Sequence, residues 1–422
     1  MAGVVLKGAS MGPPVYGVRW NSAADTFAPG IVRGGKFIPS SYQRCPIQER
    51  MRRCVLAHTT GIRQYYCHPE NSNYKWDGAA ADLSGGDGQA VVEVPQFHCI
   101  IGKHDGDYRY FLTSERQFYL VLSDNSVVTS AVHPWFYEGG LVTPSKYKYF
   151  SAFEGVLKRG GSYLDGTGSQ TGAAGDLIHS VAGYKPLTYF TRTERRTYTA
   201  DGVFHQLGFW SGEALILLML TEYKSFNSQV WLPGYTEGGA WNFATKVNKT
   251  GITAALGNAS GSVLWQNADA ALRCSADQAG KYIANSYRGI ENVFGHLWKW
   301  VDGFNVQFVG APLTEANVYV CNNPAQFADD TTTNYADLGI DLPLTSGYQR
   351  DLHAGTLLPS NVSGGSSSTY LRDYYYASPA AGWCALLSGG DLSDGADAGF
   401  APRPANASAG YRASFCGGRS AA

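Results

Sequence analysis

The chain has 422 residues and a formal net charge of −1, from 33 basic and 34 acidic residues. Charged residues make up 16% of it, below the ~25% typical of globular domains. A nucleic-acid-binding protein normally carries a basic face or run, which this sequence lacks, so we expect no nucleic-acid partner. Glycine, tyrosine and tryptophan are abundant, with 51, 27 and 10 residues, which favours short strands, many turns and aromatic contact surfaces.

Residues 1–86 are turn-rich, and we expect them to form a small β-rich attachment or oligomerisation region. Their one helical pattern is "CPIQERMRRCVLA" at 45–57, with Pro46 in a first-turn position. The first twenty residues lack the long apolar stretch of a secretory signal. A glycine-rich stretch at 78–89 then predicts a linker or exposed loop. The rest of the chain, 87–422, is predicted to be the main domain.

The middle of the chain predicts strands and one strong helix. Strand patterns occur at 90–102, 109–124 and 145–157, and a glycine-rich loop is expected at 158–176. The helix pattern lies at 211–229, with Ser211 as its N-cap, and its apolar residues lie all round, so we expect this helix to be buried. Its most apolar run is too short to cross a bilayer, which needs ~20 residues, so we expect no membrane insertion.

From residue 230 onwards, glycine, asparagine, aspartate and aromatic residues alternate in short bursts, and no long periodic segment is predicted. Within this region, "GHLWKWV" at 295–301 places Trp298 and Trp300 on either side of a lysine. Two interpretations compete for this pair. The indoles are either a packing core for a loop-rich domain or part of an aromatic binding site.

The motifs of common catalytic and cofactor sites are missing from the sequence. There is no HExxH, GxxxxGK[ST] or CxxC pattern, no strand–turn–helix elbow of the GxSxG type is predicted, and the histidines are scattered. The carboxylates at 105–110 and 327–337 could hold a structural calcium ion, but they lack EF-hand spacing, and solvated loop carboxylates are the favoured interpretation. Eight cysteines are too few for a disulfide scaffold in a chain of this length. We therefore expect no enzyme and no cofactor.

Two segments together resemble a known family. "GHLWKWV" resembles the "GNVWEWV" signature of the C-type lectin fold of the formylglycine-generating-enzyme type. Residues 382–420 resemble the closing segment of that fold, with Gly389-Gly390 at its turn and "SFCGGR" at 414–419 as its last strand. This combination is similar to the variable proteins of diversity-generating retroelements, which include phage major tropism determinants and prophage tail proteins.

The resemblance implies an α+β, loop-rich C-type lectin fold over 87–422, behind the small β-rich N-terminal region. It implies that Trp298 and Trp300 are structural core, packed under the long loops. It also implies that "AVVEVPQF" at 90–97 and the last strand at 414–419 are antiparallel neighbours.

The resemblance also places a variable ligand-binding face in the segment 382–420. Relatives vary by mutation at adenines, mostly in asparagine codons, and the matching positions are expected to share one exposed surface, while Leu392, Phe400 and Phe415 turn inward. The alternative is that these are ordinary polar loop residues. The matching positions are Asp391, Ser393, Asp394, Asp397, Pro404, Gly410, Arg412 and Ser414, with Pro402 and Tyr411 between them and Tyr374, Tyr375 and Tyr376 at the border.

The function implied by the resemblance is host attachment. The chain would be a receptor-binding protein at a phage or prophage tail-fibre tip, made in the bacterial cytoplasm and located in the virion. It would bind a host cell-surface protein or glycan, contact other virion tail proteins and form a homo-oligomer, with a trimer favoured. Because such proteins fold in a reducing cytosol, most cysteines are expected to be free thiols.

Two alternatives stay open. One is a structural virion protein of the tail or head decoration, with no diversified site. The other is a nonheme-metal oxidoreductase of the same fold. The second is disfavoured because Cys384 and Cys416 lie outside the cysteine motif of the catalytic members, and the apolar helix supplies no histidine ligand.

Overall fold

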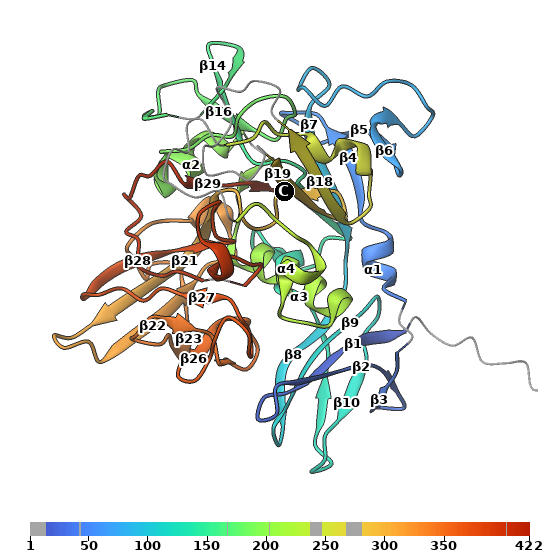
Figure 1. Cartoon of the computed structure of the whole chain (residues 1–422), viewed down its shortest axis with the longest axis vertical. Helices are drawn as coiled ribbons and strands as arrows, with labels where there is room; N and C mark the ends of the chain where they lie inside the picture. Colours follow the sequence, from blue (N-terminus) through green and yellow to red (C-terminus); the bar gives the residue numbers. More distant parts are fainter. Residues whose placement is uncertain are drawn as a thin grey trace, which may run out of the picture.

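The computed structural model describes residues 14–41, 44–166, 168–201, 203–236, 247–266, 281–401 and 403–422 (Figure 1). The chain is β-rich, with 38% strand and 12% helix, and consists mostly of small antiparallel sheets arranged like a four-bladed β-propeller. The expected α+β, loop-rich C-type lectin fold is therefore wrong. The bursts of glycine and aromatic residues after position 230 suggested loops, but many of them pair as short strands, which satisfies their backbone N–H and C=O groups.

A six-stranded antiparallel sheet contains the first strands of the chain. Its strands, in spatial order, are β12 (Ala131–Val132), β8 (His98–Asp105), β9 (Tyr108–Ser114), β1 (Val15–Asn21), β2 (Thr26–Arg33) and β3 (Lys36–Pro39). A short hairpin, β10 (Tyr119–Val121) with β11 (Val127–Thr129), follows β9 along the chain.

A seven-stranded sheet joins strands from early in the chain to the last described strand. Its order is β17 (His205–Gln206), β30 (Ser420–Ala421), β13 (Tyr147–Ser151), β7 (Gln89–Pro95), β4 (Arg52–Leu56), β5 (Arg63–His68) and β6 (Asn71–Lys75). Strands from both sides of residue 86 share this sheet and the six-stranded one. These two sheets therefore show no separation at the predicted domain boundary.

The expected direct pairing of 90–97 with 414–419 is wrong. Strand β13 lies between β7 and β30, and β29 (Cys416–Gly417) lies in a different sheet. The reason is that the last residues of the chain pair first with a strand of one sheet and then with strands of another. The chain runs parallel to the start of β21 at Cys416 and then, after Arg419, pairs with β13 and β17.

A five-stranded sheet in the C-terminal third supports the site described below. It consists of β23 (Ala336–Asp341), β22 (Glu315–Val320), β21 (Trp298–Val309) and β28 (Gly382–Ser388), with β29 beside β21. Smaller sheets are β15–β14–β16 (Ser162–Leu164, Val156–Arg159, Leu177–His179), β18–β19–β20 (Gly261–Gln266, Lys281–Tyr287, Ile290–Glu291), β24–β27 (Gly347–Tyr348, Tyr374–Tyr375) and β25–β26 (Asp351–Leu352, Pro359–Asn361).

In the part of the chain that the structure describes, the helices are few and mostly short. The α-helices are α1 (Pro46–Glu49), α2 (Arg192–Thr199), α3 (Phe209–Tyr223) and α4 (Ser228–Trp231), and single 3-10 turns are η1 (Pro134–Tyr137), η2 (Ile252–Leu256), η4 (Pro324–Gln326) and η5 (Gly395–Asp397). The predicted helix at 45–57 covers only α1, because the chain enters the seven-stranded sheet as β4 directly afterwards. Helix α2 was not predicted, although Thr191 and Glu194 form a capping box that the sequence carries.

Helix α3 is buried, as predicted, and occupies the middle of the molecule (Figure 1). It packs against strands of the six-stranded sheet and against β21. It begins at Phe209 after Gly208, so Ser211 is not its N-cap; the Ser211 hydroxyl instead donates to the carbonyl of Gly208 at 2.7 Å. Its apolar surface belongs to the main core cluster, which also contains Val18 and Phe304.

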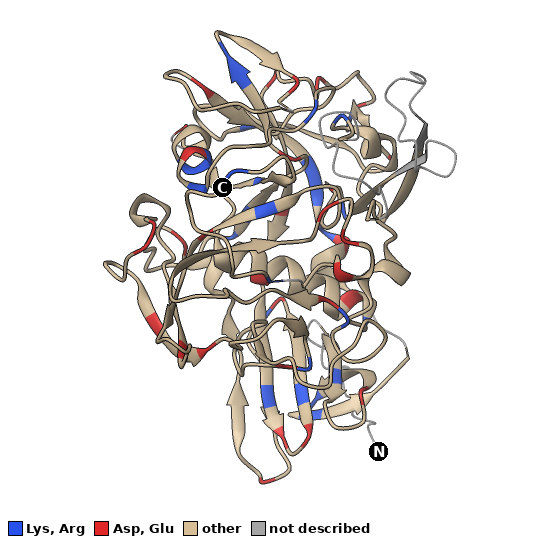
Figure 2. Cartoon of the chain, turned by 60° about the vertical axis from the view of Figure 1, so that its left-hand side comes forward, with Lys and Arg blue, Asp and Glu red and all other residues tan. Residues whose placement is uncertain are grey.

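Basic and acidic positions are interspersed over the described part of the chain (Figure 2). This agrees with the even charge balance of the sequence. Among the described residues, no helix is both long and apolar enough to cross a bilayer.

Candidate functional site: an aromatic–acidic pocket

A cavity of about 660 Å³ lies where β21, β28 and the segment 404–415 meet. We call it the aromatic–acidic pocket. Its aromatic lining residues are Trp298, Tyr376, Trp383, Tyr411 and Phe415, its acidic ones are Asp391 and Asp394, and its neutral polar ones are Ser378, Asn406 and Ser408. Pro379–Gly382, Cys384, Leu387, Pro404 and Ala407 complete the lining. The volume is within the range of small-molecule sites, about 300–1,000 Å³.

Trp298 forms part of the wall because of its place in the sheet. It is the first residue of β21, where that strand lies between β28 and β29. Its indole is 5% exposed and meets the ring of Tyr376 edge-on, with centroids 6.4 Å apart. The Tyr376 hydroxyl donates to Oδ2 of Asp397 at 3.0 Å, which orients the tyrosine ring.

Trp300 is fully buried and lies outside the pocket lining. Its indole N–H donates to the carbonyl of Phe190 at 3.2 Å. Both tryptophans are therefore buried, as predicted for structural core, and Trp298 also lines the pocket. The structure thus confirms the burial expected of core residues for both tryptophans, and the interpretation as an aromatic binding site stays a prediction for Trp298.

The acidic pair follows β28 through the Gly389-Gly390 turn. Both glycines have positive φ, 99° and 75°, and a Cβ on Gly390 would come within 2.5 Å of the Cβ of Ala398. A side chain is therefore disfavoured at Gly390 for two reasons, backbone strain and space. The turn directs Asp391 and Asp394 into the same pocket, where the Asp391 N–H donates to Asp394 Oδ2 at 2.6 Å.

Burial disfavours the ionised form of both carboxylates and so raises their pKa values. Burial, with the nearby charge of Asp391 as the next cause, raises the pKa of Asp394 to about 7. Burial also raises the pKa of Asp391, against the hydrogen bonds from Ser393 and the charge of Lys299. At neutral pH the Asp394 carboxyl is therefore close to the midpoint of its titration, and its protonation is coupled to that of Asp391.

The segment 404–408 also lines the pocket, and backbone hydrogen bonds hold it to β28. The N–H of Ala385 donates to the carbonyl of Ala407 at 2.8 Å, and the N–H of Leu387 donates to the carbonyl of Pro404 at 3.1 Å. In this extended stretch the alanines at 405, 407 and 409 are buried, while Asn406 and Ser408 are exposed.

Asn406, Ser408 and Trp383 are pocket residues that sequence reasoning missed. The signal for the first two was present in "ANASAG" at 405–410, where small apolar and polar residues alternate with the period of a strand. Trp383 had no such signal, because its position beside the cavity depends on the pairing of β28 with β21.

The predicted variable positions divide into three groups. Asp391, Asp394, Pro404, Tyr411 and Tyr376 line the pocket, although Asp391 and Pro404 are buried and so do not have the exposure that was expected of them. Leu392 and Phe400 are buried as expected, whereas Phe415 is half-buried. The predicted positions outside the lining are Ser393, Asp397, Gly410, Arg412, Ser414, Tyr374 and Tyr375, and Pro402 lies outside the described residues.

Four of the predicted positions outside the lining are either exposed or engaged in other contacts. Gly410 and Arg412 are exposed, and Arg412 forms an ion pair with Glu194 of α2 at 2.7 Å. Tyr375 is fully buried and donates to the carbonyl of Pro343 at 3.0 Å. Tyr374 packs against Tyr376, with ring centroids 4.6 Å apart, and so supports the pocket wall from behind.

Buried polar anchors fix the pocket segment to the core. Arg403 is fully buried and lies 2.5 Å from Glu213 of α3 through its Nη2. The Asp373 carboxylate accepts the Ala401 N–H at 2.8 Å, and the amide of Gln349 donates to the Ala401 carbonyl at 2.7 Å. These contacts make the pocket a preformed feature of the fold.

A second buried cluster lies behind the pocket. Lys299 donates to the carbonyl of Gly295 at 2.7 Å and lies 3.3 Å from Glu154, which also contacts His296. Burial lowers the pKa of Lys299 to about 8. Burial alone would raise the pKa of Glu154, but the charges of His296 and Lys299 lower it to about 2. The cluster uses the histidine and lysine of "GHLWKW" as structural groups.

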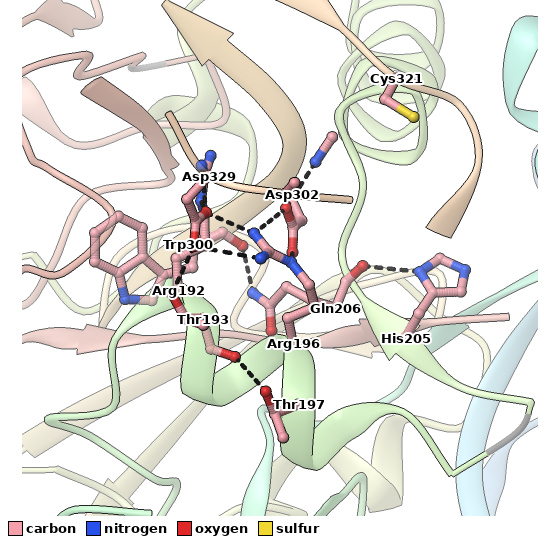
Figure 3. A network of polar contacts seen from close by, with 12 residues as sticks. Arg192, Thr193, Arg196, Thr197, His205, Gln206, Trp300, Asp302, Cys321 and Asp329 are labelled. Atoms are coloured by element: carbon pink, nitrogen blue, oxygen red, sulfur yellow. Dashed lines mark hydrogen bonds and ion pairs between the residues drawn. The ribbon is translucent and has the colours of Figure 1, made fainter. Parts of the chain in front are cut away.

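Asp329, one of the carboxylates considered for calcium, is ion-paired instead. Arg196 bridges Asp302 and Asp329 at 2.6 Å each, and Arg192 donates to Asp329 at 2.7 Å (Figure 3). Burial would raise the pKa of Asp329, but these two guanidinium groups lower it to about 2. The prediction of solvated loop carboxylates is thus wrong for Asp329, which ties the segment after η4 to α2, while Asp302 ties β21 to the same helix.

The cysteines and the possible metal ligands lie apart from one another in the described part of the chain. There, no group of three or more His, Cys, Asp or Glu side chains is placed to hold a metal ion. Cys45, Cys54, Cys67, Cys99, Cys321, Cys384 and Cys416 are free thiols, as predicted, and Cys274 lies outside the described residues.

No protein-family model matches the chain, and no curated protein matches its sequence.

Proposed function

We propose that this chain is a receptor-binding protein of a phage or prophage tail, which holds a host cell-surface protein or glycan noncovalently in the aromatic–acidic pocket. The observation that carries the proposal is the pocket itself. Five aromatic side chains and five polar ones converge on a cavity of about 660 Å³ in the segment that resembles the variable region. Concave sites with aromatic walls and a few placed polar groups are the usual form of ligand sites.

The architecture suits a site whose surface residues change while its frame stays constant. Arg403, Asp373 and Gln349 hold the pocket segment from below, whereas Asn406, Ser408 and Tyr411 are exposed and lie on the pocket. Exposed substitutions usually change stability by less than about 0.5 kcal/mol. A retroelement that diversified such positions would alter recognition at little cost to folding.

We expect a single site to bind modestly, because the pocket is small. Presentation of several copies, in a homo-oligomer for which a trimer is favoured, would raise the overall affinity by roughly 10²–10⁴. The protein would then act in binding rather than in catalysis, in contact with other tail proteins of the virion.

The test combines three exposed pocket substitutions, Asn406→Ala, Ser408→Ala and Tyr411→Ala. We expect an unchanged melting temperature and a loss of attachment to bacterial host cells. A matched control combines Thr332→Ala and Thr333→Ala with Tyr74→Ala. Tyr74 is 47% exposed, against 41% for Tyr411, and it lies on β6 of the seven-stranded sheet, whereas the pocket strands β21 and β28 belong to the five-stranded sheet.

Full attachment by the pocket variant would contradict the proposal and favour a structural virion protein without a receptor site. The genetic part of the proposal has a separate test in the neighbouring DNA. A reverse-transcriptase gene with a near-copy of the codons for 382–420 supports diversification, and their absence argues against it.

A further inference from the structure

The charged residues described in the lining of the aromatic–acidic pocket are all acidic. Its lining contains Asp391 and Asp394 but, within the described residues, no lysine, arginine or histidine. The basic group behind it, Lys299, is engaged elsewhere, because its ammonium donates to the Gly295 carbonyl and pairs with Glu154. A ligand that enters the pocket therefore meets two carboxyl groups and, among the described residues of the lining, no cationic side chain.

The acidic pair also has unused acceptor capacity. Asp391 is 1% exposed, and its Oδ1 accepts from the N–H and hydroxyl of Ser393, both at 2.7 Å. Asp394 Oδ2 accepts the Asp391 N–H. Among the described residues, the side-chain hydrogen bonds of this pair involve Asp391 Oδ1 and Asp394 Oδ2, and none involves Asp391 Oδ2 or Asp394 Oδ1. These two oxygens are therefore available to accept hydrogen bonds from a donor that enters the cavity.

The aromatic walls complement this charge. Trp298 and Tyr376 form one edge-to-face pair, and Tyr411 and Phe415 form a second, tilted pair with centroids 6.1 Å apart. The faces of indole and phenol rings attract organic cations, most strongly where water is excluded. Anions are repelled by the carboxylates, and a neutral sugar can donate hydroxyl hydrogen bonds to them but brings no counter-charge.

We propose that the aromatic–acidic pocket binds an organic ammonium group on the host-surface ligand, with the rings of Trp298 and Tyr376 against the cation and Asp391 and Asp394 as its counter-charge. The inference rests on the proposed function, since it names the chemistry of the same site. Two sources carry this group, a quaternary ammonium of the choline type and a primary amine of an amino sugar or lysine side chain.

The test measures binding of small probes to the full chain by titration calorimetry at pH 8. Choline is compared with 3,3-dimethyl-1-butanol, its neutral isostere, and glucosamine with glucose. We expect at least one cationic probe to bind about tenfold more tightly than its neutral partner. Choline alone points to a quaternary ammonium, and glucosamine alone to a primary amine.

The critical variant is Asp394→Asn, which removes the charge and keeps an oxygen that can accept the Asp391 N–H. We expect it to lose the preference for the cationic probe while its melting temperature shows that it is folded. Asp337→Asn is the matched control, because Asp337 is exposed on β23, away from the pocket, and its carboxylate accepts the Gly339 N–H at 2.7 Å. It should bind as the wild type does.

Equal binding of the charged and neutral probes, binding that Asp394→Asn leaves unchanged, or no binding of either cation would each overturn the inference. The proposed function fails separately. If the variant with alanine at 406, 408 and 411 loses attachment but the probes show no charge preference, the pocket is the receptor site and its ligand is of another class. If that variant still attaches to host cells but the wild type prefers the ammonium probes, the pocket binds organic ammonium groups but is not the receptor site.

Discussion

The backbone N–H of Asp391 donates to Oδ2 of Asp394 at 2.6 Å, which holds two carboxylates together at one wall of an aromatic cavity. Gly389 and Gly390 make this possible, because both adopt positive φ at the end of β28. Like charges at close range in a poorly solvated site resist ionisation together, so the pair links the pH to the stability and to the ligand preference of the pocket.

The stability of the protein should depend on pH through Asp394. Its folded pKa is raised to about 7, against about 3.9 in an unfolded chain. Between these values the folded state holds a proton that the unfolded state releases, so this carboxyl's contribution to stability rises as the pH falls from about 7 towards 4. Asp391, Asp397, Lys299 and the Tyr376 hydroxyl also face the site, and so the comparison must be with a variant.

Asp394→Asn isolates that contribution. At pH 8 the wild type carries the charge on residue 394 and the variant does not, so the variant should gain melting temperature relative to the wild type. At pH 5 the gain should shrink or vanish. Thermal unfolding at both pH values measures the difference, and an equal gain at both would contradict the raised pKa.

The Gly389-Gly390 turn should be intolerant of side chains. Gly390→Ala places a Cβ 2.5 Å from the Cβ of Ala398 and forces alanine to φ 75°. We therefore expect the free energy of unfolding to fall by about 1–3 kcal/mol. We also expect ligand binding to be lost, because the turn positions Asp391 and Asp394. Gly410→Ala is the matched control, since a Cβ at this position would meet nothing within 4 Å and its φ is not positive. Urea unfolding of both variants should separate them clearly.

The buried pair of Arg403 and Glu213 should be costly to break from one side. Arg403→Met leaves the Glu213 carboxylate buried without its guanidinium partner, so we expect a loss of about 3–5 kcal/mol. The exposed pair of Arg412 and Glu194 gives the comparison, because Arg412→Ala should cost less than about 1 kcal/mol. The double variant Arg403→Met/Glu213→Leu should recover much of the loss in denaturant unfolding, and no recovery would show that packing rather than charge is responsible.

Trp300 should contribute to stability without contributing to binding. Its indole is fully buried in a cluster with residues of β28 and β29 and lies outside the pocket lining, so Trp300→Ala should cost about 3–5 kcal/mol. Trp76→Ala, at a tryptophan that is 59% exposed, should change stability by less than about 0.5 kcal/mol. Similar unfolding midpoints for the two variants would contradict the core role of Trp300.

The sequence by itself determined those features that depend on local composition. The all-round apolar pattern of 211–229 predicted the burial of α3, because a helix without a polar face cannot lie at a surface. The Trp298–Trp300 pair was predicted to be buried, and the cysteines to be free. The even charge balance likewise appears in the structure as interspersed basic and acidic positions (Figure 2).

The tertiary structure alone decided the fold class and the membership of the site. Asp391 and Pro404 lie in the pocket wall while Arg412 turns to Glu194, although all three came from the same matched segment. The reason is that a side chain in an extended stretch points to one face or the other according to its pairing. The register of 404–407 along β28 is set by backbone bonds between residues that are distant in sequence, so no local pattern reports it.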